Sequence, residues 1–284
     1  MHLTPTQRAM VARAKRYPFD PPSTSYLFVD GASWYLRDYN RREPRKSLVN
    51  INGSSQQVDQ VLTHHGYDPA ALSVPRVPVI ASGSNASPTR LNEKYSGTPG
   101  QTLIPVIKCQ IADLVPAFSA KFASYGSITA TLQYAPGFQS DMFVTYLSEA
   151  QLIRMHETEA IGDEYHFMQI NNVTMRRTGV RSMVVPIYAY ISVKGVLQVN
   201  NVQFTLSDMA VANTRFAARS QVEILQLAWE LLKSNQTLDV FIYENISNER
   251  IRRRHNDRLQ AYSAPFAHTE VKLMEGPTRA LFVS

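Results

Sequence analysis

Two short segments of the chain carry side chains that could do chemistry on a small molecule. The first is a loop made of Ser82, Gly83, Ser84 and Asn85, which follows the apolar run 77–81. A glycine among small polar residues lets successive backbone N–H groups point into one concavity, and such a concavity binds carboxylate or phosphate. Ser87 and Pro88 then predict the start of a helix, whose N-terminus adds a dipole of the same sign. Gly-Ser-Asn is also typical of an ordinary turn.

The second segment, 152–161, holds His156, Glu157 and Glu159 near the end of a predicted helix. A positioned carboxyl group can take a proton from a reacting group and return it, which makes both glutamates candidate acids or bases. By spacing alone, an exposed and charged helix end explains the same residues.

Taken in this order, the two segments resemble the gamma-glutamylcyclotransferase family. The hallmark loop of that family, Tyr-Gly-Ser-Asn, corresponds to Ser82-Gly83-Ser84-Asn85. An apolar-Phe-Ser element corresponds to Ala117-Phe118-Ser119, and a Gly-x-x-x-Ala-Thr strand to residues 126–131, with a turn at Pro136-Gly137. A Leu-Asp-x-x-Glu-Gly-like element aligns with residues 155–160, and a following aromatic residue with Tyr165. The resemblance covers about Val77 to Ile170.

The resemblance implies an enzyme that cleaves a γ-glutamyl amide by intramolecular aminolysis, releasing 5-oxoproline and an amine. It assigns the general acid/base to Glu159 and not to Glu157, so we expect Glu159 inside a pocket and Glu157 outside it. It assigns substrate binding to Ser82, Gly83, Ser84, Asn85 and Tyr165. It implies no cofactor and no metal, because nucleophile and electrophile belong to one molecule.

The chain departs from the family pattern at several points. Ser82 stands in place of the loop tyrosine, which removes one aromatic wall of the expected pocket, and Ala160 stands in place of the glycine. The segment from Glu159 to Tyr165 is about one residue shorter than the corresponding segment of the family pattern. Residues 1–75 have no counterpart in the resemblance.

Periodicity and capping patterns predict alternating helices and strands. The predicted helices are 5–16, 54–65, 88–91, one that follows Ser148, one that follows Ser220, and an Arg-rich helix in the tail. The predicted strands are 26–29, 77–81, 104–111, 116–122, a hairpin of 128–134 with 142–147, 165–170, 184–193, and a strand-like run in the tail. This mixed order predicts an α+β fold. The resemblance adds a mixed, β-barrel-like sheet with flanking helices.

We expect three regions along the chain. Residues 1–75 form an N-terminal extension, helical and irregular, and residues 76–200 form the gamma-glutamylcyclotransferase-like core. Residues 201–284 form a C-terminal helical region packed on that core.

Charge and cysteine usage limit the partners and the compartment. The formal charge is +6, with basic clusters at Arg37 to Lys46 and Arg250 to Arg254. No zinc-finger, RNA-binding or helix-turn-helix pattern accompanies them, so we expect a small-molecule γ-glutamyl substrate and no nucleic-acid partner. A basic surface also attracts small anions. One cysteine, Cys109, excludes an internal disulfide and favours a reducing, cytoplasmic setting. The absence of a long apolar run predicts no membrane span.

Three other interpretations stay open. The fold could serve a binding or structural role without catalysis. Cys109 could act as a nucleophile with His156 or His166, although its apolar run predicts an inert buried thiol. The histidines His64 and His65, with His156 and His166, could bind a metal, but their spacing matches no known ligand pattern.

Overall fold

The helices surround a central sheet in a computed structural model that describes residues 2–20, 22–98, 102–177, 182–209, 211–212, 216–275 and 278–282. The α-helices are α1 Pro5–Lys15, α2 Val58–His64, α3 Pro88–Tyr95, α4 Glu149–Glu159, α5 Gln221–Leu231, α6 Leu238–Ser247 and α7 Glu249–Leu259. The strands are β1 Tyr26–Val29, β2 Ala32–Asp38, β3 Leu48–Ile51, β4 Ser54–Gln57, β5 Val77–Ala81, β6 Leu103–Phe122, β7 Ile128–Leu147, β8 Tyr165–Arg176, β9 Met183–Ser192, β10 Val196–Val199, β11 Val202–Leu206, β12 Val211–Ala212, β13 Ala217–Arg219, β14 Ser263–Ala264 and β15 Val271–Leu273.

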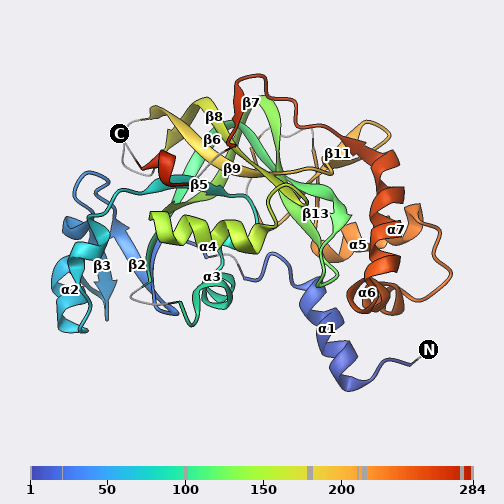
Figure 1. The fold of residues 1–284 in the computed structure, drawn as a ribbon, viewed down its shortest axis with the longest axis horizontal. Coiled ribbons are helices and arrows are strands. Elements are labelled where there is room, and N and C mark those ends of the chain that lie inside the picture. Colours follow the sequence, from blue (N-terminus) through green and yellow to red (C-terminus); the bar gives the residue numbers. More distant parts are fainter. Residues whose placement is uncertain are drawn as a thin grey trace.

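Five strands close into a β-barrel. Strand β5 pairs with β7, β7 with β6, β6 with β8, β8 with β9, and β9 returns to β5. The β9–β5 pair is parallel and the other four are antiparallel. Closure removes the unpaired edges that an open sheet would expose. The remaining strands lie outside the ring, and helices flank it (Figure 1), which confirms the predicted α+β, barrel-like fold.

The two longest strands, β6 and β7, run antiparallel to each other along their whole length. The prediction of a hairpin with a turn at Pro136-Gly137 was wrong, because both halves of β7 pair with β6 and not with each other. The register shifts beside Asp113, whose backbone is left-handed and whose carboxylate accepts a hydrogen bond from the Gly137 N–H at 2.6 Å. The turn-forming residues therefore make a bulge that bends two continuous strands.

The N-terminal region contributes more strand than expected. Strand β1 pairs with β6 of the barrel, and β2, β3 and β4 continue the sheet outward to one end of the molecule, where α2 packs (Figure 1). The description of residues 1–75 as helical and irregular was therefore incomplete. The predicted helix 54–65 was too long, because residues 54–57 form β4 and the helix begins at Val58.

Helices α5, α6 and α7 gather at the opposite end, together with α1 (Figure 1). Their apolar side chains pack with those of β6 and β7 in one buried cluster that includes Phe118, Phe122, Ile224 and Phe241. The strand-like run predicted in the tail is helix α6, and the Arg-rich helix is α7. The predicted boundaries at residues 75 and 200 remain predictions.

Three predicted helix starts are confirmed by complete capping boxes. Thr4 and Gln7 cap α1, Ser148 and Gln151 cap α4, and Ser220 and Glu223 cap α5. In each, the two side chains satisfy backbone N–H groups that the first helical turn leaves unpaired. None of the helices in the described residues combines the length and apolar character needed to cross a membrane.

Helix α4 ends in a strained residue. Ala160 follows Glu159 with φ +46° and ψ +61°, the left-handed conformation in which a β-carbon is crowded.

We expect Ala160→Gly to raise the free energy of unfolding by about 1 kcal/mol, because glycine adopts this conformation without that strain. Denaturant unfolding measures the change. As a control, Glu157→Gly, within the right-handed part of α4, should lower stability; equal destabilisation by both changes would contradict the argument.

Candidate functional site

A cavity of about 310 Å³ opens beside the C-terminal end of α4. The sequence-predicted site residues all line it, namely Ser82, Gly83, Ser84, Asn85, Glu159 and Tyr165. They come from the loop after β5, the end of α4 and the start of β8. The fold thus brings together groups that lie up to about 80 residues apart in the sequence.

The two glutamates of α4 lie in different surroundings. The side chain of Glu159 is 11% exposed and faces the cavity. The side chain of Glu157 is 57% exposed, forms an ion pair with Arg154 at 2.9 Å, and does not line the cavity. Of the two carboxylates, only Glu159 can reach a molecule bound there.

Glu159 is held by a buried lysine. The ammonium of Lys94, on α3, forms an ion pair with Oε1 of Glu159, and the Lys94 side chain is only 3% exposed. Asn85 Nδ2 donates to the same oxygen at 3.1 Å. Among the described contacts, none occupies Oε2. Burial lowers the pKa of Lys94, while the neighbouring Glu159 carboxylate acts in the opposite direction.

A counter-charge is needed at this place for two reasons. Glu159 is the last residue of α4, and the C-terminal end of a helix carries a partial negative charge that disfavours a carboxylate. Burial disfavours it as well. Lys94 offsets both effects, so α3 and α4 are joined at the site by opposite charges.

Gly83 is required by the space around it. A β-carbon built there would overlap the hydroxyl of Tyr17 and lie 2.8 Å from Cβ of Ala130. The Tyr17 hydroxyl in turn accepts a hydrogen bond from the Ala130 N–H at 2.8 Å. The loop therefore packs directly on a residue of the N-terminal region.

Tyr165 lies beside a second ion pair, which joins the buried Lys121 to the partly exposed Glu164. Its hydroxyl donates to Thr129 Oγ1 at 2.8 Å, and its ring lies 4.1 Å from the ammonium of Lys121. Lys121, whose side chain is 2% exposed, forms an ion pair with Glu164. Burial lowers the pKa of Lys121 and raises that of Tyr165. Tyr165 stays a neutral phenol beside a cation.

Several cavity residues were not predicted from the sequence. They are Tyr17, Arg90, Lys94, Lys121, Tyr125 and Arg252. The tyrosines supply aromatic walls although Ser82 replaces the family tyrosine, and burial raises the pKa of Tyr17 to about 12. Lys94 lies four residues after Arg90 on α3, and no local signal marks it as buried. Tyr17 and Tyr125 lie outside every motif that the sequence analysis used.

The described contacts do not join Cys109 and the histidines in one site, as a cysteine nucleophile or a metal centre would require. Cys109 is 2% exposed within β6, its thiol donates to the Ile107 carbonyl at 3.6 Å, and burial raises its pKa to about 12. His156 Nδ1 instead contacts the Tyr190 hydroxyl at 2.8 Å, and burial lowers the His156 pKa to about 4. The described residues contain no group of three or more His, Cys, Asp or Glu side chains arranged to hold a metal.

Comparisons with known proteins give distant structural likenesses. No family model and no curated protein matches the sequence. A solved gamma-glutamyl cyclotransferase is 11% identical with a TM-score of 0.33, covering 73% of this chain and 98% of its own. An uncharacterised human protein has the same identity and coverages with a TM-score of 0.31. A protein of Arabidopsis thaliana is 15% identical, with a TM-score of 0.32 and coverages of 56% and 87%. Likenesses this distant carry no argument about activity, which must come from the site.

The packing of Gly83 on Tyr17 predicts a coupled effect. Gly83→Ala should lower the free energy of unfolding by about 1–3 kcal/mol, because the added methyl group overpacks the contact. In Gly83→Ala/Tyr17→Phe the hydroxyl is removed as well. The double variant should therefore lose less free energy of unfolding than the two single variants lose together. A double-mutant cycle by denaturant unfolding measures the coupling. Strict additivity would show that the two residues do not touch.

The buried ion pair predicts an asymmetric mutant cycle. Lys94→Met should lower the free energy of unfolding by about 3–5 kcal/mol, because it leaves the Glu159 carboxylate buried without its counter-charge. Lys94→Met/Glu159→Gln removes both charges and should recover most of that loss. Denaturant unfolding of the four proteins gives the coupling. If the double variant is as unstable as Lys94→Met, or less stable, then loss of the ion pair does not cause the destabilisation of Lys94→Met.

Proposed function

We propose that this cavity binds a γ-glutamyl amide and cyclises it, releasing 5-oxoproline and an amine, with Glu159 as general acid/base. The observation that carries the proposal is the 3.1 Å contact between Asn85 and Glu159 inside the cavity. It puts the shielded carboxyl group of Glu159 next to the loop that is suited to bind an anionic group. Both belong to the segments that resemble the gamma-glutamylcyclotransferase family.

The reaction needs only a proton carrier and a folded substrate. The α-amine nitrogen attacks the γ-carbonyl carbon, the new N–C bond closes a five-membered ring, and the bond to the amide nitrogen breaks. Glu159 takes the proton that the attacking amine loses and gives it to the departing nitrogen. Holding the flexible chain in the attacking geometry supplies much of the rate gain. The reaction consumes no oxidant or reductant.

In this proposal each cavity residue has a separate role. Lys94 and Asn85 hold Oε1 of Glu159, so Oε2 is the oxygen left to exchange a proton with the substrate. Backbone N–H groups and the Ser84 side chain of the loop, with the cavity cation Arg90, suit the substrate α-carboxylate. Tyr165 forms part of the wall. A volume of about 310 Å³ suits a small ligand. A cofactor-free reaction and a single thiol fit the proposed cytoplasmic setting.

A binding role without catalysis is the second candidate, and one observation favours it. Without substrate, Oε1 of Glu159 is already committed to Lys94 and Asn85, so the carboxyl group could serve only to fix the loop and α3. In that case a γ-glutamyl compound, or another small amino acid derivative, would bind and leave unchanged.

Activity assays distinguish the two candidates. With a panel of γ-glutamyl compounds, we expect the native chain to release 5-oxoproline and Glu159→Gln to be slower by about a hundredfold to ten-thousandfold, the usual contribution of a general acid/base. Glu157→Gln, the matched change two residues away, should keep native activity. Product is measured by mass spectrometry, and folding by thermal unfolding. Equal activity of the native chain and Glu159→Gln would remove Glu159 from the mechanism, and binding without product would favour the second candidate.

A further inference from the structure

A larger cavity lies in the N-terminal region, apart from the site of Glu159. Its volume is about 560 Å³, and it shares no lining residue with the Glu159 cavity. It lies between the connection from β2 to β3, the segment before β5, and the end of β7. Its basic lining side chains are Arg41, Arg42, Arg45, Lys46 and Arg76, and its acidic ones are Glu43 and Asp59.

A second hollow of about 600 Å³ shares Tyr39 with this cavity and continues its charge. Its charged lining residues are Arg37, Asp38, Lys108, Asp141, Arg176 and Arg177. Nine basic and four acidic side chains thus line the two hollows, which we call the basic trough. Of the nine cations, only Lys46 and Lys108 form ion pairs with other described residues. Much of the chain's net charge of +6 is concentrated here.

Arg76 places a fixed positive charge at the inner side of the trough. Its guanidinium donates to the carbonyl oxygens of Tyr146 at 3.0 Å and Ala71 at 2.8 Å, and to Gln151 Oε1 at 3.0 Å. All three acceptors are neutral, and its Nε is buried without a described partner. Burial lowers the Arg76 pKa to about 10, so the group stays charged at neutral pH. This charge is not neutralised by any described carboxylate.

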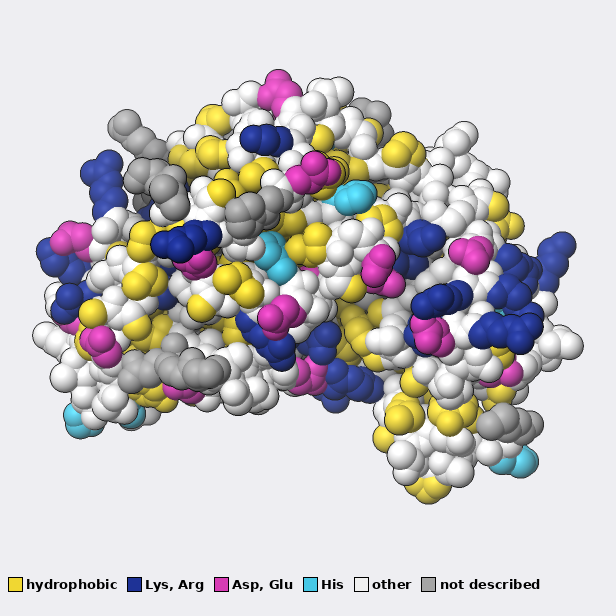
Figure 2. Space-filling model, in the orientation of Figure 1, with side chains coloured by type: hydrophobic (Ala, Val, Ile, Leu, Met, Phe, Trp, Pro, Cys, Tyr) yellow, Lys and Arg dark blue, Asp and Glu magenta, His cyan; other side chains and the backbone are white. Residues whose placement is uncertain are grey.

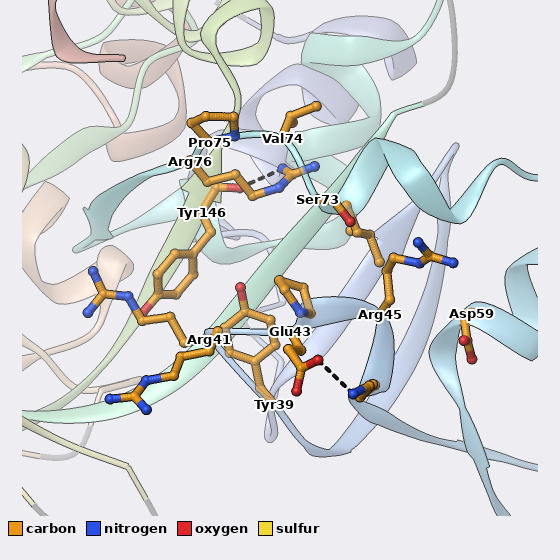
Figure 3. Close-up of a pocket in the computed structure, with 14 residues that line it drawn as sticks. Tyr39, Arg41, Glu43, Arg45, Asp59, Ser73, Val74, Pro75, Arg76 and Tyr146 are labelled. Carbon is orange, nitrogen blue, oxygen red and sulfur yellow. Dashed lines mark hydrogen bonds and ion pairs between the residues drawn. The ribbon is translucent and has the colours of Figure 1, made fainter. Parts of the chain in front are cut away.

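The exposed arginines stand around this fixed charge. Figure 3 shows the Arg76 guanidinium beside the backbone carbonyl of Tyr146, with Arg41 and Arg45 extending to opposite sides of Glu43. Tyr39 lines both hollows, and the Arg177 guanidinium lies 5.7 Å from the centroid of the Tyr39 ring. Long arginine side chains at a rim around a partly buried guanidinium can converge on one anion with several charges.

We propose that the basic trough binds a small molecule carrying several phosphate or carboxylate groups. Two features favour a compact polyanion over a nucleic-acid strand. The rings of Tyr39 and Tyr146 are 6% and 3% exposed, so the trough offers no open aromatic face for bases to stack on. The charge also centres on one guanidinium, that of Arg76, with the exposed arginines Arg41 and Arg45 lining the same hollow.

The other basic cluster shows why charge alone does not make such a site. On α7, Arg253 pairs with Glu249, and Figure 2 shows basic side chains interspersed with acidic ones over α6 and α7. Arg250 and Arg254 are exposed and line none of the larger cavities. That surface is a solvated helix face, and it supplies a matched control.

The test is binding of inorganic tripolyphosphate to the full chain, measured by isothermal titration calorimetry at low salt. Arg41→Gln/Arg45→Gln removes two rim cations at exposed positions. Arg250→Gln/Arg254→Gln removes the same charge from α7. We expect one-to-one binding to the native chain, a loss of at least about tenfold in affinity for the rim variant, and less than about twofold for the control.

Three outcomes would overturn the proposal. The first is no binding of tripolyphosphate to the native chain. The second is an equal loss in both variants, which would mean attraction to the overall charge only. The third is a single-stranded oligothymidylate that binds more tightly than tripolyphosphate and is weakened by the same rim changes, which would make the trough a nucleic-acid site. None of these results depends on 5-oxoproline release.

Discussion

The buried ion pair between Lys94 and Glu159 is the interaction on which the candidate site depends. It joins α3 to the C-terminal end of α4, where the helix dipole and the loss of water both disfavour a carboxylate. Asn85 ties the same oxygen to the loop after β5. The loop and α3, which are neighbours in sequence, therefore share one carboxyl oxygen of the distant helix α4, and a shift in any of them would move the group proposed to carry the proton.

The barrel explains how these segments are held. Strand β5 lies between β7 and β9, so the loop that leaves it starts from a strand fixed on both sides. The long pair β6–β7 supplies Lys121, Thr129 and Ala130 to the cavity wall. Residue Tyr17, which follows α1, closes against Gly83. The N-terminal region is thus part of the site and not an appendage to it.

Much of the fold could be predicted because its signals are local. Capping boxes marked the starts of α1, α4 and α5, and the apolar run 77–81 marked β5. The errors arose where tertiary contacts decide. Pro136-Gly137 is ordinary turn chemistry, and only pairing with β6 makes it a bulge. At the site, short motifs predicted the loop and Glu159, which line one cavity in the structure. Lys94 could not be found, because a lysine on a short helix is usually exposed and only the packing of α3 against α4 buries it.

The central claim is that the α-amine of the substrate, and not a water molecule, attacks the γ-carbonyl carbon. Isotope labelling tests this claim directly. A γ-glutamyl substrate would be turned over in heavy-oxygen water, and the products weighed by mass spectrometry. Intramolecular aminolysis predicts 5-oxoproline without heavy oxygen, since the ring carbonyl keeps the substrate's own oxygen. Glutamate that carries heavy oxygen in its γ-carboxyl group would show hydrolysis by water and would contradict the account.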